Sequence, residues 1–115
     1  MTGLALVVTH TLLPAHEEAF DALVQRTVAS IRTLEPGTIV YATHTVAGSP
    51  RLRVFYELYR DLAAFTAHEQ YPHMQVFLAD RVAHVESVDV QRLDVLTTHS
   101  SATMPEAPAI SATDS

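Results

Sequence analysis

Residues 54–77 read VFYELYRDLAAFTAHEQYPHMQVF, and two changes of pattern within this stretch decide the fold. The stretch begins inside residues 52–59, whose β-branched and aromatic residues predict a strand. Asp61 then suits the N-cap of a helix, and Pro72 breaks or kinks that helix before a second helical piece. The pattern therefore predicts a strand followed by two helical segments.

The residues before this stretch predict two more strands and a helix. Residues 4–13 and 38–46 are strand-like, and between them apolar residues recur with the helical period until Pro36 and Gly37. Residues 47–51, AGSPR, predict a turn that joins the second strand to the third.

A last strand is predicted at residues 86–96, which completes the order β-α-β-β-α-β. This order is typical of a ferredoxin-like α+β domain, in which helices cover one face of an antiparallel sheet. We expect one such domain over residues 1–97. Residues 98–115 are rich in Ser, Ala, Thr and Pro, and we expect them to form a disordered tail.

Both faces of the predicted sheet carry apolar residues. Along residues 52–59, one face holds Phe55 and Tyr59 together with Glu57. The other face is also apolar, and its residues are Leu52, Val54, Tyr56 and Leu58. Because the helices can cover only one face, we expect a second copy of the chain to cover the other, as a homodimer.

Composition narrows the classes of function. The chain has 115 residues, 48% of them hydrophobic and 17% charged, which is typical of a globular domain. The formal net charge is −6 and all seven basic residues are Arg, so no basic stripe indicates a nucleic-acid partner. No apolar run suits a membrane span, and the absence of Cys excludes thiolate sites. We expect a cytoplasmic protein without nucleic-acid or membrane partners.

Two stretches resemble a known family. They are EPGTIVYATH at residues 35–44, and residues 54–77 with their E-x-aromatic strand end, AAxxxH helix and PH pair. Both are similar to the antibiotic biosynthesis monooxygenase (ABM) family, and the resemblance covers residues 4–96. It implies dimeric α+β barrels of ferredoxin-like protomers. It also implies oxygenation of a phenolic, quinol or anthrone-like substrate by O2, without flavin, haem or metal. The strand residue that is often Trp in this family corresponds to Tyr59.

The segment HEQYPH, residues 68–73, looks like the zinc motif HExxH but differs in spacing. Residues four apart share a helical face, whereas His68 and His73 are five apart, a rotation of roughly 140° at about 3.6 residues per turn. Pro72 also interrupts the helix between them. We expect no shared metal.

Three residues are candidates for catalysis. His68 lies on the helical face that turns toward the sheet, and as a base it would take or share the proton of a phenolic substrate. Glu57 would orient a histidine or accept a substrate hydroxyl, with Tyr59 beside it across the cleft. Each has a structural alternative, namely a histidine that holds the helix on the sheet, a carboxylate paired with Arg53 or Arg81, and a core aromatic.

Four further residues are candidates for substrate binding. Phe55 and Phe65 suit an aromatic substrate or an ordinary core. His73 either lines the mouth of the pocket or satisfies backbone groups at the helix break. His44 faces either the cleft or the dimer interface, since alternation along its strand does not choose between them.

Other activities stay open at this point. An isomerase or cyclase could use the same base without O2, and a ligand-binding module would show no turnover at all. The faces occupied by His10 and Tyr41 are as ambiguous as that of His44.

Overall fold

The structure is a computed structural model that describes residues 3–99. Its elements are β1 (Leu4–Leu12), α1 (Glu17–Leu34), β2 (Thr38–Val46), β3 (Ser49–Tyr59), α2 (Leu62–Gln70), α3 (Pro72–Asp80), the 3-10 helix η1 (Arg81–Ala83) and β4 (Val85–Asp94). This order confirms the ferredoxin-like α+β fold that the sequence predicts. Residues 100–115 of the predicted tail lie outside the described residues.

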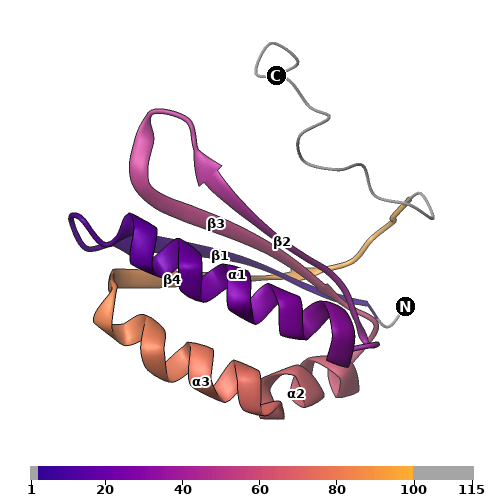
Figure 1. The fold of residues 1–115 in the computed structure, drawn as a ribbon. Coiled ribbons are helices and arrows are strands. Elements are labelled where there is room, and N and C mark those ends of the chain that lie inside the picture. Colours follow the sequence, from indigo (N-terminus) through magenta and orange to yellow (C-terminus); the bar gives the residue numbers. More distant parts are fainter. Residues whose placement is uncertain (1–2, 100–115) are drawn as a thin grey trace.

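The four strands form one antiparallel sheet in the order β2-β3-β1-β4. Figure 1 shows α1, α2 and α3 together on one face of this sheet. The core lies between the two layers, and alternate residues of β1, from Leu4 to Leu12, are buried in it. Within residues 3–99, no helix combines the length and the hydropathy that crossing a membrane requires.

The facing of β3 follows the predicted alternation. Phe55, Glu57 and Tyr59 are buried on the helix side, whereas Val54 and Tyr56 on the other face stay partly exposed. Polar side chains of this strand are therefore held under the helices, where an ionisable group needs a partner.

The turn between β2 and β3 is shorter than predicted. It consists of Ala47 and Gly48, and β3 already begins at Ser49. Gly48 has φ 77°, which lets two residues reverse the chain. Pro50 is tolerated in the strand because it lies beyond the last residue that β3 pairs with β1, which is Leu52.

The helix break at Pro72 is confirmed. Asp61 caps α2 by accepting a hydrogen bond from the backbone N–H of Ala64 at 2.8 Å. The next helix starts at Pro72, where a missing N–H costs nothing, and Tyr71 between the two helices is extended. The break lets α2 and α3 take separate directions over the sheet.

Gly37 lies where α1 passes into β2, against the first turn of α2. A Cβ at this position would lie 2.6 Å from Cβ of Ala64. The carbonyl of Gly37 also accepts the backbone N–H of Arg60 at 3.0 Å. The Pro-Gly pair thus ends α1 and also allows α2 to pack close to the backbone.

We expect Gly37→Ala to destabilise the fold by about 1–3 kcal/mol, because the added methyl overpacks this contact. The double variant with Ala64→Gly should recover part of the loss, measured as a positive coupling in urea unfolding. Gly48→Ala is the matched control. Its cost comes from the positive φ alone, since a Cβ there meets nothing within 4 Å, and Ala64→Gly should not change it. Purely additive effects for Gly37 and Ala64 would contradict the contact.

Candidate active site

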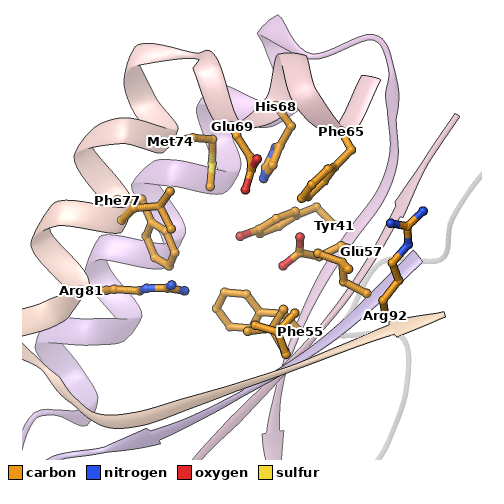
Figure 2. A pocket seen from close by; sticks show the side chains of 14 residues that line it. Tyr41, Phe55, Glu57, Phe65, His68, Glu69, Met74, Phe77, Arg81 and Arg92 are labelled. Atoms are coloured by element: carbon orange, nitrogen blue, oxygen red, sulfur yellow. The ribbon is translucent and has the colours of Figure 1, made fainter. Parts of the chain in front are cut away.

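A cavity of about 280 Å³ lies between the sheet and the helices α2 and α3 (Figure 2). Most of its wall is apolar or aromatic, with Phe55 and Phe65 among the lining residues. Its polar lining residues come from five different elements, and they are Tyr41, Glu57, His68, Glu69, Arg81 and Arg92. A mostly apolar cavity with a few convergent polar groups is typical of a small-molecule site.

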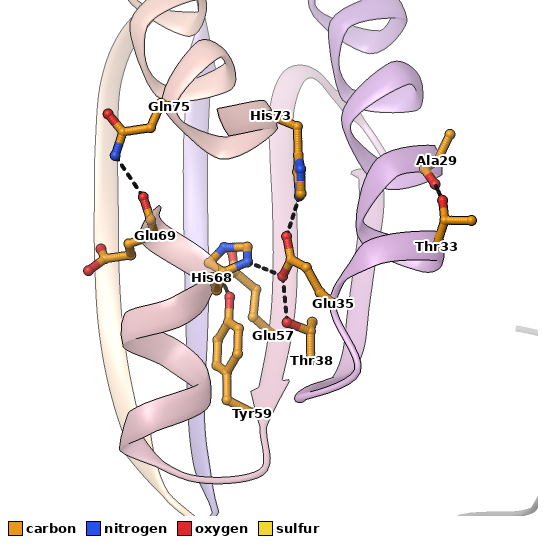
Figure 3. Close-up of polar contacts among 10 residues, drawn as sticks. All are labelled: Ala29, Thr33, Glu35, Thr38, Glu57, Tyr59, His68, Glu69, His73 and Gln75. Carbon is orange, nitrogen blue, oxygen red and sulfur yellow. Dashed lines mark hydrogen bonds and ion pairs between the residues drawn. The ribbon is translucent and has the colours of Figure 1, made fainter. Parts of the chain in front are cut away.

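A buried carboxylate lies behind this cavity. Glu35, directly after α1, has a side chain that is 1% exposed. Its Oε1 accepts the hydroxyl of Thr38 at 2.6 Å and Nδ1 of His68 at 2.6 Å, and its Oε2 is bonded to Nε2 of His73 (Figure 3). Burial alone would raise the pKa of Glu35, but the hydrogen bonds from Thr38 and the two histidines hold this pKa below its usual value. Glu35 is therefore an ionised acceptor.

The contact with Glu35 decides the tautomer of His68. An ionised carboxylate can only accept hydrogen bonds, so Nδ1 of His68 carries a proton and donates it. In the neutral ring the lone pair is then on Nε2. His68 is 4% exposed and lines the cavity, and no residue among 3–99 is hydrogen-bonded to its Nε2. The ring can accept a proton from a ligand in the cavity.

Glu57 is a second ionisable group in the cavity. Its Oε1 accepts the hydroxyl of Tyr59 at 2.5 Å. Burial raises the pKa of Glu57 to about 7, although the Tyr59 hydrogen bond and the positive charge of Arg81 act in the opposite direction. Near neutral pH this carboxyl group can therefore either donate or accept a proton.

Tyr59 does not line the cavity. It is 0% exposed and packs against Phe65 and His68, with ring centroids 5.2 and 4.9 Å away. Burial and the neighbouring Glu57 raise the pKa of its hydroxyl well above the usual range, so it remains a hydrogen-bond donor. Tyr59 can act on a ligand only through Glu57.

The other predicted residues divide into two groups. Phe55 and Phe65 line the cavity, and Phe55 also belongs to the buried core against which Phe65 packs. His73 does not line it, because its ring is turned toward Glu35. His44 is exposed on β2, and its Nδ1 lies 2.8 Å from the carbonyl oxygen of Val54, so the structure does not bring it to this site.

The predicted ion-pair alternatives for Glu57 are not formed in the described part of the chain. Arg53 pairs instead with Asp21 of α1, with Nε and Oδ1 at 2.8 Å. Arg81 shares the cavity with Glu57 but lies beyond ion-pair distance of it.

The two histidines of HEQYPH do converge, which their spacing on one helix does not predict. His68 belongs to α2 and His73 to α3, and the extended Tyr71 between them lets both rings reach one carboxylate. Among residues 3–99, no group of three His, Asp or Glu side chains is placed to hold a metal ion.

Sequence reasoning misses Glu35, because the EPG motif predicts a helix stop and carries the family resemblance but indicates no role for its carboxylate. One signal was present. A carboxylate at the C-terminal end of a helix is disfavoured by the helix dipole, so it indicates a partner elsewhere. The partners are 33 and 38 residues away in the sequence, and no periodicity identifies them.

Comparison with known proteins identifies the family of the chain. Residues 4–80 match the antibiotic biosynthesis monooxygenase family. The chain belongs to this family. No curated protein matches the chain. The crystal structure of PA3566 from Pseudomonas aeruginosa is similar, with 30% identity and a TM-score of 0.77 over 84% of this chain and 97% of that one.

Two further solved structures show the shared fold. Rv0793 from Mycobacterium tuberculosis is 24% identical, with a TM-score of 0.79 over 86% of this chain and all 100% of that one. A proposed antibiotic biosynthesis monooxygenase from Caulobacter crescentus is 20% identical, with a TM-score of 0.80 over 84% of this chain and 92% of that one.

We expect Glu57→Gln to stabilise the fold more at about pH 8 than at about pH 5. Between the usual value of 4.5 and the folded pKa of about 7, the folded protein binds more protons than the unfolded chain, so its stability falls as pH rises. Gln keeps an acceptor for Tyr59 and cannot ionise, so above pH 7 the gain should reach up to about 3 kcal/mol. Urea unfolding across this pH range measures it.

Glu69→Gln is the control for this measurement, since Glu69 lines the same cavity but is exposed. Its effect should stay within about 0.5 kcal/mol at every pH. An effect of Glu57→Gln that does not change with pH would show that Glu57 is ionised in the folded protein throughout.

Proposed function

We propose that this ABM-family chain is a monooxygenase that oxidises a phenolic, quinol or anthrone-like small molecule with O2, without a bound cofactor. The observation that carries the proposal is the orientation of His68. Its Nδ1 donates to the buried Glu35 at 2.6 Å, which leaves Nε2 as a proton acceptor at an apolar cavity.

The first step is removal of the substrate's proton by His68. Triplet O2 reacts poorly with a neutral phenol, whereas the anion donates an electron more readily. Ionised Glu35 stabilises the imidazolium that forms, so the pair works as a base whose orientation is fixed before the substrate arrives. The family resemblance supports the substrate class, and the aromatic walls at Phe55 and Phe65 are compatible with it.

The oxidation that follows needs no electrons other than those of the substrate, and O2 is the only oxidant. The substrate anion transfers one electron to O2, and the resulting radical pair combines to form a carbon-bound peroxide. The peroxide takes up a proton and loses water, leaving a carbonyl, so that RH2 + O2 gives R=O + H2O. Glu57, whose pKa is about 7, is suited to supply a proton in this last stage, with Tyr59 holding it in place.

An isomerase or cyclase is the second candidate, because a base and an acid that line one cavity, here His68 and Glu57, can also move a proton between two carbons. Oxygen uptake separates the two functions, since an isomerase turns over equally well under argon. Binding of many phenols without turnover of any would indicate a ligand-binding module.

We expect His68→Ala to lower turnover by about 10²–10⁴-fold, the range that a positioned base contributes. Activity should recover at high pH, where a phenolic substrate ionises without help. A screen of hydroquinones and anthrones by O2 uptake provides the assay. His99→Ala removes an exposed histidine outside the cavity and should change nothing. Wild-type turnover of His68→Ala at every pH would remove His68 from the mechanism.

We further propose that the chain forms a homodimer through the sheet face that the helices leave open. This face carries partly exposed apolar side chains on three neighbouring strands, among them Val7, Val40, Val54 and Tyr56. Water contact with such a face is unfavourable, and a second copy of the same sheet would remove it.

Light scattering at micromolar concentration should give twice the mass of one chain. Val54→Lys, on this face, should shift the protein toward the monomer, whereas Val76→Lys is the control, because Val76 is equally apolar and exposed on α3. A monomeric mass for the unmodified protein would contradict this assembly.

A further inference from the structure

Two arginines line the cavity, and Arg92 is exposed whereas Arg81 is half-buried without a counter-ion among residues 3–99. Arg81 follows α3, and Figure 2 shows its guanidinium pointing into the cavity. Within residues 3–99, no carboxylate lies within ion-pair distance of it, although Arg51, Arg53 and Arg60 each have one. Burial lowers the pKa of Arg81, which reflects a guanidinium partly removed from water. A desolvated charge is costly unless something in its surroundings pairs with it.

The residue that holds Arg81 is a neutral histidine. His10 is 0% exposed, and its Nε2 lies 3.2 Å from Nη1 of Arg81. Its ring is packed between Phe20 and Phe55, with centroids 5.1 and 4.4 Å away. Burial, followed by the charge of Arg81, lowers the pKa of His10 to about 4, so Nε2 is an unprotonated acceptor at neutral pH. The guanidinium also lies over the ring of Phe77, 5.8 Å from its centroid.

This way of holding Arg81 leaves its positive charge available. A carboxylate in the place of His10 would fix the guanidinium equally well but would neutralise it. Glu57 and Tyr41 are the titratable groups whose charges act on Arg81 from the cavity. The first is partly protonated near neutral pH and burial raises the pKa of the second, so neither is a permanent counter-ion.

We propose that Arg81 is the binding site for an anionic oxygen of the ligand, such as a phenolate or enolate oxygen, and that His10 is the residue that positions it. The inference rests on the proposed function for the aromatic nature of the ligand. Arg81 would be a second point of contact with the ligand besides His68. Figure 2 shows Arg81 and His68 at opposite ends of the cavity, with Tyr41 and Glu57 between them. A ring with oxygens at two positions can place one at each end, as in a hydroquinone or a hydroxylated anthrone.

Two matched probes test this site without any turnover. They are 4-nitrophenol, which absorbs visible light strongly only as its phenolate, and 4-nitroanisole, which has nearly the same shape but no ionisable hydroxyl. Binding is measured under argon, at a pH slightly below the pKa of free 4-nitrophenol. We expect the wild-type protein to increase the phenolate absorbance on binding.

Arg81→Gln should weaken 4-nitrophenol binding by about tenfold to a hundredfold, the range for losing a hydrogen bond to a charged group, and should abolish the absorbance increase. Affinity for 4-nitroanisole should stay within about twofold, since it makes no charged contact. Arg60→Gln makes the same change of charge at an exposed position outside the cavity and should leave both affinities unchanged.

His10→Phe tests the positioning role. Phe fills a similar volume among the aromatic rings but cannot accept a hydrogen bond from Arg81. We expect a smaller phenolate absorbance increase and weaker 4-nitrophenol binding, with 4-nitroanisole binding retained. Arg81→Lys, which keeps the charge and loses the planar guanidinium, should retain part of the increase and shows that the site is still folded.

Separate outcomes distinguish this inference from the proposed oxygenase activity. If no phenol consumes O2 but the absorbance increase occurs and depends on Arg81, the anion site stands and the oxygenase does not. In His68→Ala the increase should persist, because Arg81 stabilises the phenolate independently of the base. Equal weakening of both probes in Arg81→Gln, or binding of 4-nitrophenol to the wild-type protein without any absorbance increase, would overturn the anion site.

Discussion

The arrangement of the whole site depends on one buried carboxylate, that of Glu35. It accepts hydrogen bonds from the start of β2, from α2 and from α3, through Thr38, His68 and His73. Hydrogen bonds to charged groups contribute about 1.5–3 kcal/mol each, and here they must offset both burial and an unfavourable position at the end of a helix. Because the same carboxylate fixes helix positions and the tautomer of His68, the packing of the fold and its proton chemistry cannot be changed independently.

The cavity contains two groups of charged and polar residues that do not neutralise one another. At the α2 end, Glu35 and His68 form a base with its own negative partner. At the α3 end, Arg81 is held by the neutral His10. Glu57 lies between them with a pKa of about 7, so its protonation responds to the charge that a ligand brings. An anion near Arg81 would favour protonated Glu57, which could then act as a proton donor to the ligand.

The parts of this structure that depend on local pattern could be predicted from the sequence. Strand alternation assigned Phe55, Glu57 and Tyr59 to the helix face, and helical phase assigned His68 to the cavity. Alternation identifies a face but not depth, which is why Tyr59 was expected at the ligand although it lies behind Glu57.

The interactions that the sequence did not predict are tertiary contacts between distant residues. The contact of Glu35 with His68 spans 33 positions and that of Arg81 with His10 spans 71. Neither follows from a period of 2 or 3.6 residues. The convergence of His68 and His73 depends further on the direction that α3 takes after Tyr71, and a proline break predicts only that the helix ends.

The side chains that shape the cavity are different from those that hold the helices in place, and this separation has an evolutionary consequence. Phe65, Leu78 and Val90 shape the cavity through apolar side chains, and the hydrogen bonds that fix the helices run through other side chains. Val90 is exposed and Phe65 and Leu78 are half-buried, so changes of volume there cost less stability than changes at fully buried core positions. Descendants of one ancestral chain could therefore exchange these side chains and acquire new ligands while keeping the same base and the same framework.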